Sequence, residues 1–141
     1  MKVDIEFIII LTTPVLFSII LVLYWYTKRR RPTKWKLEVY KQLGEISHRS
    51  STKDNQILQT VLIDIDKLLD YTMRMKGIKG ETMGERLKNA KRYFKWDDYQ
   101  KVWEGHKYRN KLVHEIGIKV DTNTIKVHFM ALKKAVNGLA K

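Results

Sequence analysis

The stretch that decides the fold is DNQILQTVLIDIDKLLDYTMRMKG, residues 54–77. Its apolar residues recur three or four positions apart, which is the spacing of one face of an α-helix. The residues of that face are Ile57, Leu58, Val61, Leu62, Ile65, Leu68, Leu69 and Thr72. Ser51 and Asp54 have the spacing of a capping box at its start, and Gly77 suits its end. We therefore predict one long amphipathic helix, whose apolar face must be buried against other elements.

Helical spacing recurs on both sides of this stretch. We predict four further helices, over about 33–47, 82–94, 97–115 and 122–139. Thr82 with Glu85 makes a second capping box, and Thr122 or Thr124 opens the last helix. No alternating apolar pattern longer than four residues appears in this part of the chain. The predicted fold is all-α: an up-and-down bundle of four or five helices that forms one domain over residues 33–141.

The N-terminal segment IEFIIILTTPVLFSIILVLYWY, residues 5–26, is almost wholly apolar. About 20 such residues cross the hydrocarbon core of a bilayer as an α-helix. Acidic Asp4 and Glu6 stand at the start of the run and basic residues follow it, which is the reverse of a secretory signal peptide. We therefore expect a transmembrane anchor over residues 1–27, with the lipid bilayer as the partner of residues 5–26.

Basic residues cluster directly after this segment and form a predicted juxtamembrane linker over residues 28–32. The residues that we expect at the membrane interface are Trp25, Lys28, Arg29, Arg30 and Arg31. Basic residues flank the cytoplasmic side of membrane spans. We therefore expect a single-pass membrane protein with its N-terminus outside and its C-terminal domain in the cytoplasm.

The composition excludes several classes of protein. The 141 residues include no cysteine, which excludes a disulfide scaffold and a thiolate metal site. Four tryptophans, seven tyrosines and four phenylalanines are too many aromatic residues for a disordered chain. The 28 basic residues outnumber the 15 acidic ones and give a formal charge of +13, which attracts RNA and anionic lipid alike.

Basic and aromatic residues are interleaved between residues 91 and 108. The residues that we predict to bind nucleic acid are Arg92, Lys95, Lys107 and Lys111. Neighbouring tyrosine and tryptophan side chains can stack on bases. The helical spacing of Phe94, Tyr99 and Trp103 favours a place in the core over base stacking.

Familiar catalytic motifs are mostly absent from the sequence. There is no glycine-rich phosphate loop, no G-x-S-x-G and no H-E-x-x-H. The four histidines, at positions 48, 106, 114 and 128, are too scattered for a zinc site. We therefore expect no cofactor and no metal. Asp64, Asp66 and Asp70 on the long helix are expected to form a solvated face.

The segment WEGHKYRNKLVHE, residues 103–115, combines side chains with a shared chemical use. On a helix, His106, Asn110 and His114 are four residues apart and share a face. Arg109 lies at the edge of that face. Arginine offers planar donors to a phosphate, histidine transfers protons near neutral pH, and asparagine can hold either in place. Such a set can bind a phosphodiester and assist attack by a ribose 2′-hydroxyl, although these are also ordinary residue types for a solvated helix.

The segment Arg109-Asn110-Lys-Leu-Val-His114 resembles the R-x4–6-H motif of the HEPN family, in which a polar residue often follows the arginine. The context is similar too, because HEPN domains are all-helical bundles of about this size with the motif near the end of a late helix. The resemblance covers about residues 35–141. It implies that Arg109 and His114 are a catalytic pair, that Asn110 supports them, and that two copies of the motif face each other in a homodimer.

The resemblance implies one activity and leaves alternatives open. Catalytic HEPN proteins are metal-independent endoribonucleases, so the expected function is a membrane-tethered, defence- or toxin-like ribonuclease that cleaves RNA through 2′-hydroxyl attack. Many HEPN relatives are not catalytic. The alternative is therefore a silent domain that dimerises and binds RNA or a partner protein, such as an antitoxin, at the membrane. A third interpretation is a basic membrane-surface protein in which the motif is a coincidence.

Overall fold

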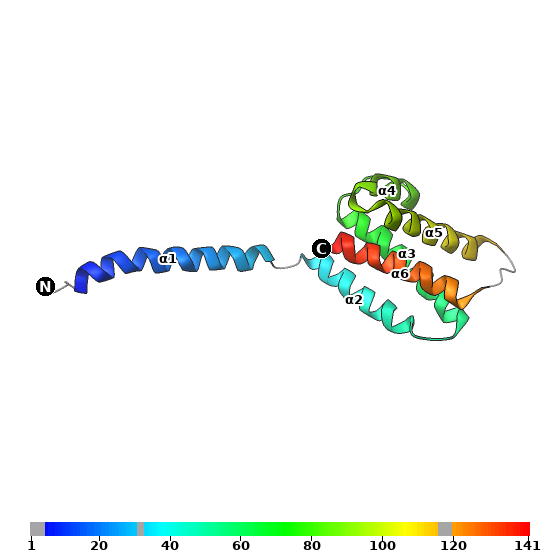
Figure 1. Cartoon of the computed structure of the whole chain (residues 1–141), viewed down its shortest axis with the longest axis horizontal. Helices are drawn as coiled ribbons and strands as arrows, with labels where there is room; N and C mark the ends of the chain where they lie inside the picture. The colour runs from blue at the N-terminus through cyan, green and yellow to red at the C-terminus, as the bar shows by residue number, and fades with distance from the viewer. Residues whose placement is uncertain (1–4, 31–32, 116–119) are drawn as a thin grey trace. The chain divides into compact units, whose positions relative to one another are not determined.

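The computed structural model describes residues 5–30, 33–115 and 120–141, with side chains described for residues 13–25, 33–115 and 120–141. The helices are α1 (Ile5–Arg30), α2 (Lys34–Arg49), α3 (Asn55–Met75), α4 (Met83–Asn89), the 3-10 helix η1 (Lys91–Tyr93), α5 (Trp96–His114) and α6 (Thr122–Ala140) (Figure 1). No strand occurs in the described residues, so the predicted all-α fold and the helical bundle are confirmed.

The chain divides into two units, Met1–Thr33 and Lys34–Lys141. The first unit contains α1, in which Ser18 Oγ donates a hydrogen bond of 2.8 Å to the carbonyl oxygen of Pro14. The side chains described for this helix, residues 13–25, are all exposed. None of them belongs to the hydrophobic core of the described residues.

The expected transmembrane anchor is the first prediction that the structure corrects. Over residues 5–30, 33–115 and 120–141, no helix has both the length and the apolar character that crossing a bilayer requires. A membrane span needs about 20 consecutive apolar residues, a requirement that no helix meets over these ranges. The predicted single-pass topology, with an outside N-terminus and a cytoplasmic C-terminal domain, is therefore wrong.

The residues predicted to lie at a membrane interface are only partly described. Trp25 lies in α1 and is exposed. Lys28, Arg29 and Arg30 belong to the same helix, but their side chains lie outside the described residues, and Arg31 lies outside them entirely. The described residues neither confirm nor contradict the predicted position of these five side chains.

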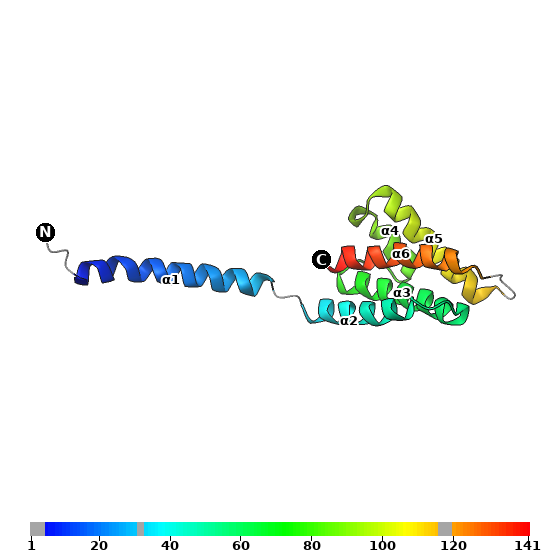
Figure 2. The ribbon, with the colours of Figure 1, turned by 60° about the horizontal axis from the view of Figure 1, so that its bottom comes forward.

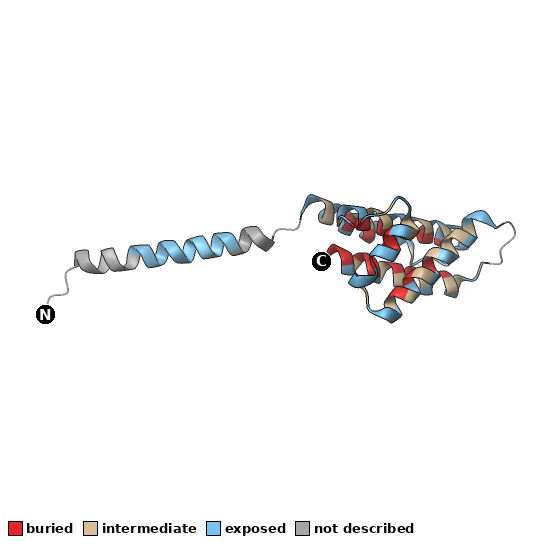
Figure 3. Ribbon diagram, turned by 90° about the horizontal axis from the view of Figure 1, so that it is seen from above, coloured by how far each residue is buried: buried red, intermediate tan, exposed pale blue. Residues whose placement is uncertain are grey.

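In the second unit, α3 is the central helix, and α2, α4, α5 and α6 all pack against it (Figure 2). Buried residues gather where these helices face one another (Figure 3). Because a fully buried large apolar side chain contributes about 1.5–3 kcal/mol, these contacts are the main source of stability. The buried apolar residues of α3 are Leu58, Val61, Leu62, Ile65, Leu68, Leu69 and Met73. Those of α2 and α6 are Val39, Leu43, Ile46, Ile125, Phe129, Leu132, Ala135, Val136, Leu139 and Ala140.

The helix starts follow the predicted caps in part. Asp54 caps α3 by accepting hydrogen bonds from two backbone N–H groups of the first turn. Thr82 and Glu85 form the predicted capping box of α4. α6 is capped by Asp121 instead of a threonine, and the carboxylate of Asp121 accepts from the backbone N–H and the hydroxyl of Thr124. Each cap satisfies N–H groups that the first turn of a helix leaves without a partner.

Aromatic residues cluster at the start of α5. Tyr99 is buried, and its ring contacts those of Phe94 and Trp103, which are half-buried against the core. The prediction of a core position is therefore confirmed for Tyr99. Tyr93 and Trp96 are exposed in the same region.

Candidate functional site

The site is built around Asp66, an acidic residue on the apolar face of α3. Asp66 follows Leu62 by four residues and precedes Leu69 by three, so helical spacing places it on the buried face. Only 2% of Asp66 is exposed. The predicted solvated face of Asp64, Asp66 and Asp70 is therefore wrong at Asp66.

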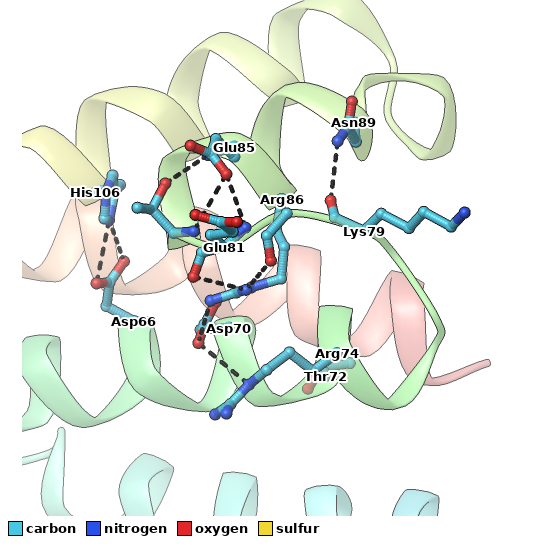
Figure 4. A network of polar contacts seen from close by, with 12 residues as sticks. Asp66, Asp70, Thr72, Arg74, Lys79, Glu81, Glu85, Arg86, Asn89 and His106 are labelled. Carbon is cyan, nitrogen blue, oxygen red and sulfur yellow. Dashed lines mark hydrogen bonds and ion pairs between the residues drawn. The ribbon is translucent and has the colours of Figure 1, made fainter.

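The other two aspartates of α3 have ion-pair partners. Asp64 is partly exposed, and its carboxylate lies 2.7 Å from the guanidinium of Arg49. Asp70 accepts two hydrogen bonds from Arg86, at 2.6 and 3.2 Å (Figure 4). Arg86 is itself buried and also donates to carbonyl oxygens of the loop before α4. The Asp70–Arg86 pair therefore anchors that loop on α3.

His106 of α5 faces Asp66 (Figure 4). Its Nδ1 lies 3.0 Å from Asp66 Oδ1 and 3.2 Å from Oδ2. The side chain of His106 is only 11% exposed. Arg109 is a second partner of the same carboxylate, with its Nε 3.4 Å from Asp66 Oδ2. Because a buried carboxylate is costly unless it is paired, these two partners are what allow Asp66 to lie in the core.

Asn110 connects His106 to Arg109. Its Nδ2 lies 3.3 Å from His106 Nε2, and its Oδ1 accepts a hydrogen bond of 2.9 Å from Arg109 Nη1. The four side chains of Asp66, His106, Asn110 and Arg109 thus close a loop of polar contacts, which we call the polar ring. Three of the four come from little more than one turn of α5, so helix geometry sets their spacing, and α3 supplies the fourth.

The arginine determines the direction of the hydrogen bonds in the polar ring. A guanidinium only donates, so Asn110 turns its carbonyl oxygen toward Arg109 and its amide nitrogen toward His106. Nε2 of His106 then accepts, and the ring proton sits on Nδ1, where Asp66 accepts it. The orientations of the amide and the imidazole follow from this network of contacts. The polar ring thus places the imidazole of His106 between a carboxylate and an amide.

Arg109 keeps donors for a further partner. Its Nε is buried without a hydrogen-bond partner in the described part of the chain, although Asp66 lies within ion-pair distance. The Arg109 side chain is 21% exposed, and no hydrogen bond among the described residues engages Nη2. A guanidinium that is held by internal partners and still partly exposed can bind a phosphate or a carboxylate.

His114 lies outside the polar ring. It is the last residue of α5, one turn beyond Asn110, and it is exposed. Among the described residues, no hydrogen bond or ion pair joins His114 to Arg109 or Asn110. The structure therefore brings together two of the three predicted catalytic residues, Arg109 and Asn110, and leaves His114 at the exposed end of the same helix.

Sequence reasoning missed Asp66 and treated His106 only as a neighbour of the motif. A signal for Asp66 was present, because it is an acidic residue at a position where the helical spacing predicts an apolar one. No signal in the sequence links it to His106, which follows 40 residues later on another helix.

The residues predicted to bind nucleic acid fall into two groups. Lys107 and Lys111 are exposed on the C-terminal half of α5, which also carries Arg109. Arg92 of η1 and Lys95, which precedes α5, are exposed near the other end of that helix. Since α5 is about 28 Å long, only Lys107 and Lys111 lie close to the end of the helix that carries Arg109.

Metal ligands are not grouped in the described residues. Residues 5–30, 33–115 and 120–141 contain no set of three or more histidine, aspartate or glutamate side chains arranged to hold a metal ion. The chemistry that the polar ring itself offers is anion binding through Arg109, in a position set by Asp66 and Asn110.

Comparison with known proteins identifies no relative of this chain. No protein-family model, no curated protein and no solved structure matches the chain. The resemblance to the HEPN family therefore rests on the motif from Arg109 to His114 and on its place in an all-α bundle.

Proposed function

We propose that residues 34–141 act as a HEPN-like, metal-independent endoribonuclease, in which Arg109 binds the scissile phosphate and His114 transfers protons. The observation that carries the proposal is the polar ring, which holds Arg109 at two points, Asp66 and Asn110. An arginine held in this way loses less conformational freedom when it binds a phosphate than a solvated arginine does.

The proposed reaction is a transesterification within the RNA strand. The ribose 2′-oxygen loses its proton and attacks the adjacent phosphorus, and the bond from phosphorus to the 5′-oxygen breaks. The 5′-oxygen takes up a proton, so the products carry a 2′,3′-cyclic phosphate and a 5′-hydroxyl. Arg109 offsets the negative charge that builds up on the phosphate oxygens.

This reaction needs a base and an acid, and the exposed end of α5 offers one histidine, His114. One imidazole cannot be neutral and protonated at the same time. A two-fold dimer supplies a second His114, because an isologous interface repeats each residue on both sides of the axis. We therefore include in the proposal a homodimer that packs through the C-terminal half of α5.

The charge of the chain supports RNA as the substrate. The formal charge of +13 attracts the negatively charged phosphate backbone of RNA through long-range electrostatics. Lys107 and Lys111 are exposed on the same half of α5 as Arg109, but each is two residues from it and lies on another face of the helix, so they add to the general attraction of RNA. The ammonium of Lys111 lies 3.8 Å from Glu115, and an exposed pair of this kind costs little to break.

A second candidate function is a non-catalytic HEPN-like module that dimerises and binds RNA or a partner protein. The observation that favours it is the position of His114, which is exposed and unconnected to the polar ring among the described residues. In this case Arg109 binds a phosphate without turnover. RNA cleavage is therefore the property that separates the two candidates.

Cleavage of a labelled single-stranded RNA by the full chain, with and without EDTA, is the first test. We expect cleavage that EDTA leaves intact and that His114→Ala lowers by a factor of about 10²–10⁴, the usual contribution of general acid–base catalysis. His48→Ala removes an exposed histidine of α2 and is the matched control, which should cleave like the wild type. Equal rates for His114→Ala and the wild type would overturn the role of His114, and RNA binding without cleavage would favour the non-catalytic module.

Two further measurements address the arginine and the dimer. Arg109→Lys keeps the charge but loses the planar pair of donors, so its cleavage rate should lie between those of the wild type and Arg109→Ala. Sedimentation equilibrium of the full chain at micromolar concentration should show a dimer. A strict monomer that still cleaves RNA would contradict the mechanism with two histidines.

A further inference from the structure

An open groove lies between α5 and α6, apart from the polar ring. The two helices pack tightly at Gly105, where a Cβ atom would lie 3.1 Å from Leu132 Cγ. The groove has a volume of about 1080 Å³. One wall follows α6 and its C-cap from Lys126 to Lys141, and the other runs from Tyr93 to Glu104. No residue of the polar ring lines it.

The floor of the groove is apolar, with Val102 and Ala135 buried and Val127 and Met130 exposed. Its apolar side chains are Phe94, Val102, Val127, Met130, Ala131 and Ala135. Val127 is 66% exposed and Met130 is 59% exposed, three residues apart on the same helix. A Cβ atom at Gly138 would meet no atom within 4 Å, so the floor stays open toward the end of α6. Neighbouring exposed apolar side chains of this kind are typical of a contact surface.

The rim of the groove is strongly basic. Its charged residues are Lys95, Lys101, Lys126, Lys133, Lys134 and Lys141, against Asp98 and Glu104. Asp98 accepts a hydrogen bond of 2.6 Å from Lys134, which holds the pKa of the Asp98 carboxyl below its ordinary value. Burial lowers the pKa of His128 in the lining, against the opposing effect of Glu104, so this histidine is neutral at pH 7. The groove therefore presents a net positive charge at neutral pH.

We infer that this groove binds an acidic amphipathic helix of a partner protein. Such a helix would place apolar side chains, three and four residues apart, against Val127 and Met130, and its carboxylates against the lysine rim. The lining from Lys126 to Lys141 extends over about 24 Å, which matches about four turns of a bound helix. The apolar floor would supply affinity, and the complementary charges would speed association and select acidic partners.

Two other occupants fit the groove less well. A second copy that docked here through its own groove would bring the six rim lysines against the same six lysines. A single RNA strand would match the lysines and could stack on Tyr93, but it would leave the exposed Val127 and Met130 without an apolar partner. An acidic amphipathic helix satisfies both the floor and the rim.

Peptide binding to the full chain tests this inference independently of the nuclease proposal. The probe is a synthetic helix of about four turns with leucines on one face and glutamates on the other. Its twin carries lysine in place of each glutamate. Fluorescence anisotropy should show binding of the glutamate peptide, and the lysine peptide should bind at least about tenfold more weakly because it meets the lysine rim.

Two single variants locate the binding surface. Met130→Asp places a carboxylate on the floor and should weaken binding of the glutamate peptide by about tenfold or more, the effect of losing one buried apolar contact. Ile57→Asp is the matched control, because Ile57 is an exposed apolar residue of α3 outside the groove, and it should bind like the wild type. Circular dichroism should show both variants folded, since both side chains are exposed.

Three outcomes would overturn the inference. The first is equal binding of the two peptides, and the second is binding that Met130→Asp leaves unchanged. The third is an absence of peptide binding while Met130→Asp abolishes either self-association or RNA binding. That result would assign the groove to a second copy of the chain or to RNA.

Discussion

Asp66 of α3 and His106 of α5 meet inside the bundle with 3.0 Å between Oδ1 and Nδ1, although 40 residues separate them in the chain. Buried ionisable pairs often add little stability compared with well-packed apolar residues. Their effect here is orientation: Asp66 orients His106, His106 orients Asn110, and Asn110 together with Asp66 holds Arg109. The polar ring therefore links the core of the bundle to an arginine at its surface.

Replacing His106 by alanine should lower the free energy of unfolding by about 1–3 kcal/mol, because the buried carboxylate of Asp66 loses its hydrogen-bond donor. Arg109 stays within 3.4 Å of Asp66 and keeps the cost below that of an unpaired buried charge. Urea denaturation of the full chain measures the change. His48→Ala, at an exposed position of α2, should stay within about 0.5 kcal/mol of the wild type. A loss for His106→Ala no larger than this control's would show that the pair with Asp66 does not form.

Asp66→Asn and Asp70→Asn form a matched pair, since each removes the charge of one carboxylate on α3, one turn apart. Asp66→Asn should lower kcat for RNA cleavage by about 10–10²-fold, because Arg109 loses its fixed position. KM should change little, because two effects on substrate binding oppose each other. Loss of the Asp66 charge favours binding of the phosphate, and the less fixed position of Arg109 weakens it. Asp70→Asn disturbs the contacts with Arg86 and Arg74, outside the polar ring, and should leave kcat unchanged. Steady-state kinetics would contradict the role of Asp66 if both variants lowered kcat equally.

Burial of His128 gives the stability a pH dependence of known sign. Desolvation lowers the pKa of His128 below its ordinary value of 6.5 in the folded chain. As the pH falls through 6.5, His128 takes up a proton in the unfolded chain before it does so in the folded chain. Its contribution to the free energy of unfolding is therefore fully present above pH 6.5 and is lost as the pH falls through the pKa of the folded chain. Urea denaturation at about pH 7.5 and about pH 5.5 should show a smaller decrease for His128→Gln than for the wild type. The same decrease in both proteins would rule out this contribution of His128.

Substitution of alanine at Gly105 and at Gly44 should change the free energy of unfolding in opposite directions. A Cβ atom at Gly105 would lie 3.1 and 3.3 Å from carbons of Leu132, whereas a Cβ atom at Gly44 would meet nothing within 4 Å. Gly105→Ala should lower the free energy of unfolding by about 1–3 kcal/mol through overpacking. Gly44→Ala should raise it by about 0.5–1 kcal/mol, because alanine favours the helix. Denaturation of both variants measures the difference, and a stabilised Gly105→Ala would mean that α5 and α6 pack less closely.

The bundle was predictable because helical spacing is a local property of the sequence. The apolar residues from Leu58 to Leu69 mark the buried face of α3, and the capping box of Thr82 and Glu85 marks the start of α4. The predicted helix over 82–94 was less accurate, because α4 ends at Asn89 and η1 follows. Nothing in the spacing of apolar residues separates these two elements.

The site was predictable only within α5. The positions of His106 and Asn110, four residues apart, place their side chains on one face, and the contact between them follows from that spacing. The contacts of Asp66 with His106 and Arg109 depend on which face of α3 meets α5. Helical spacing identifies the buried face of each helix, but it does not identify which other helix packs against that face.

The ends of the RNA fragments test the proposed function most directly. Mass spectrometry of the products made by the full chain in EDTA should find a 2′,3′-cyclic phosphate on one fragment and a 5′-hydroxyl on the other. His114→Ala should yield neither above background, because proton transfer is lost. Fragments with 3′-hydroxyl and 5′-phosphate ends, or cleavage that EDTA abolishes, would contradict metal-independent attack by the 2′-hydroxyl.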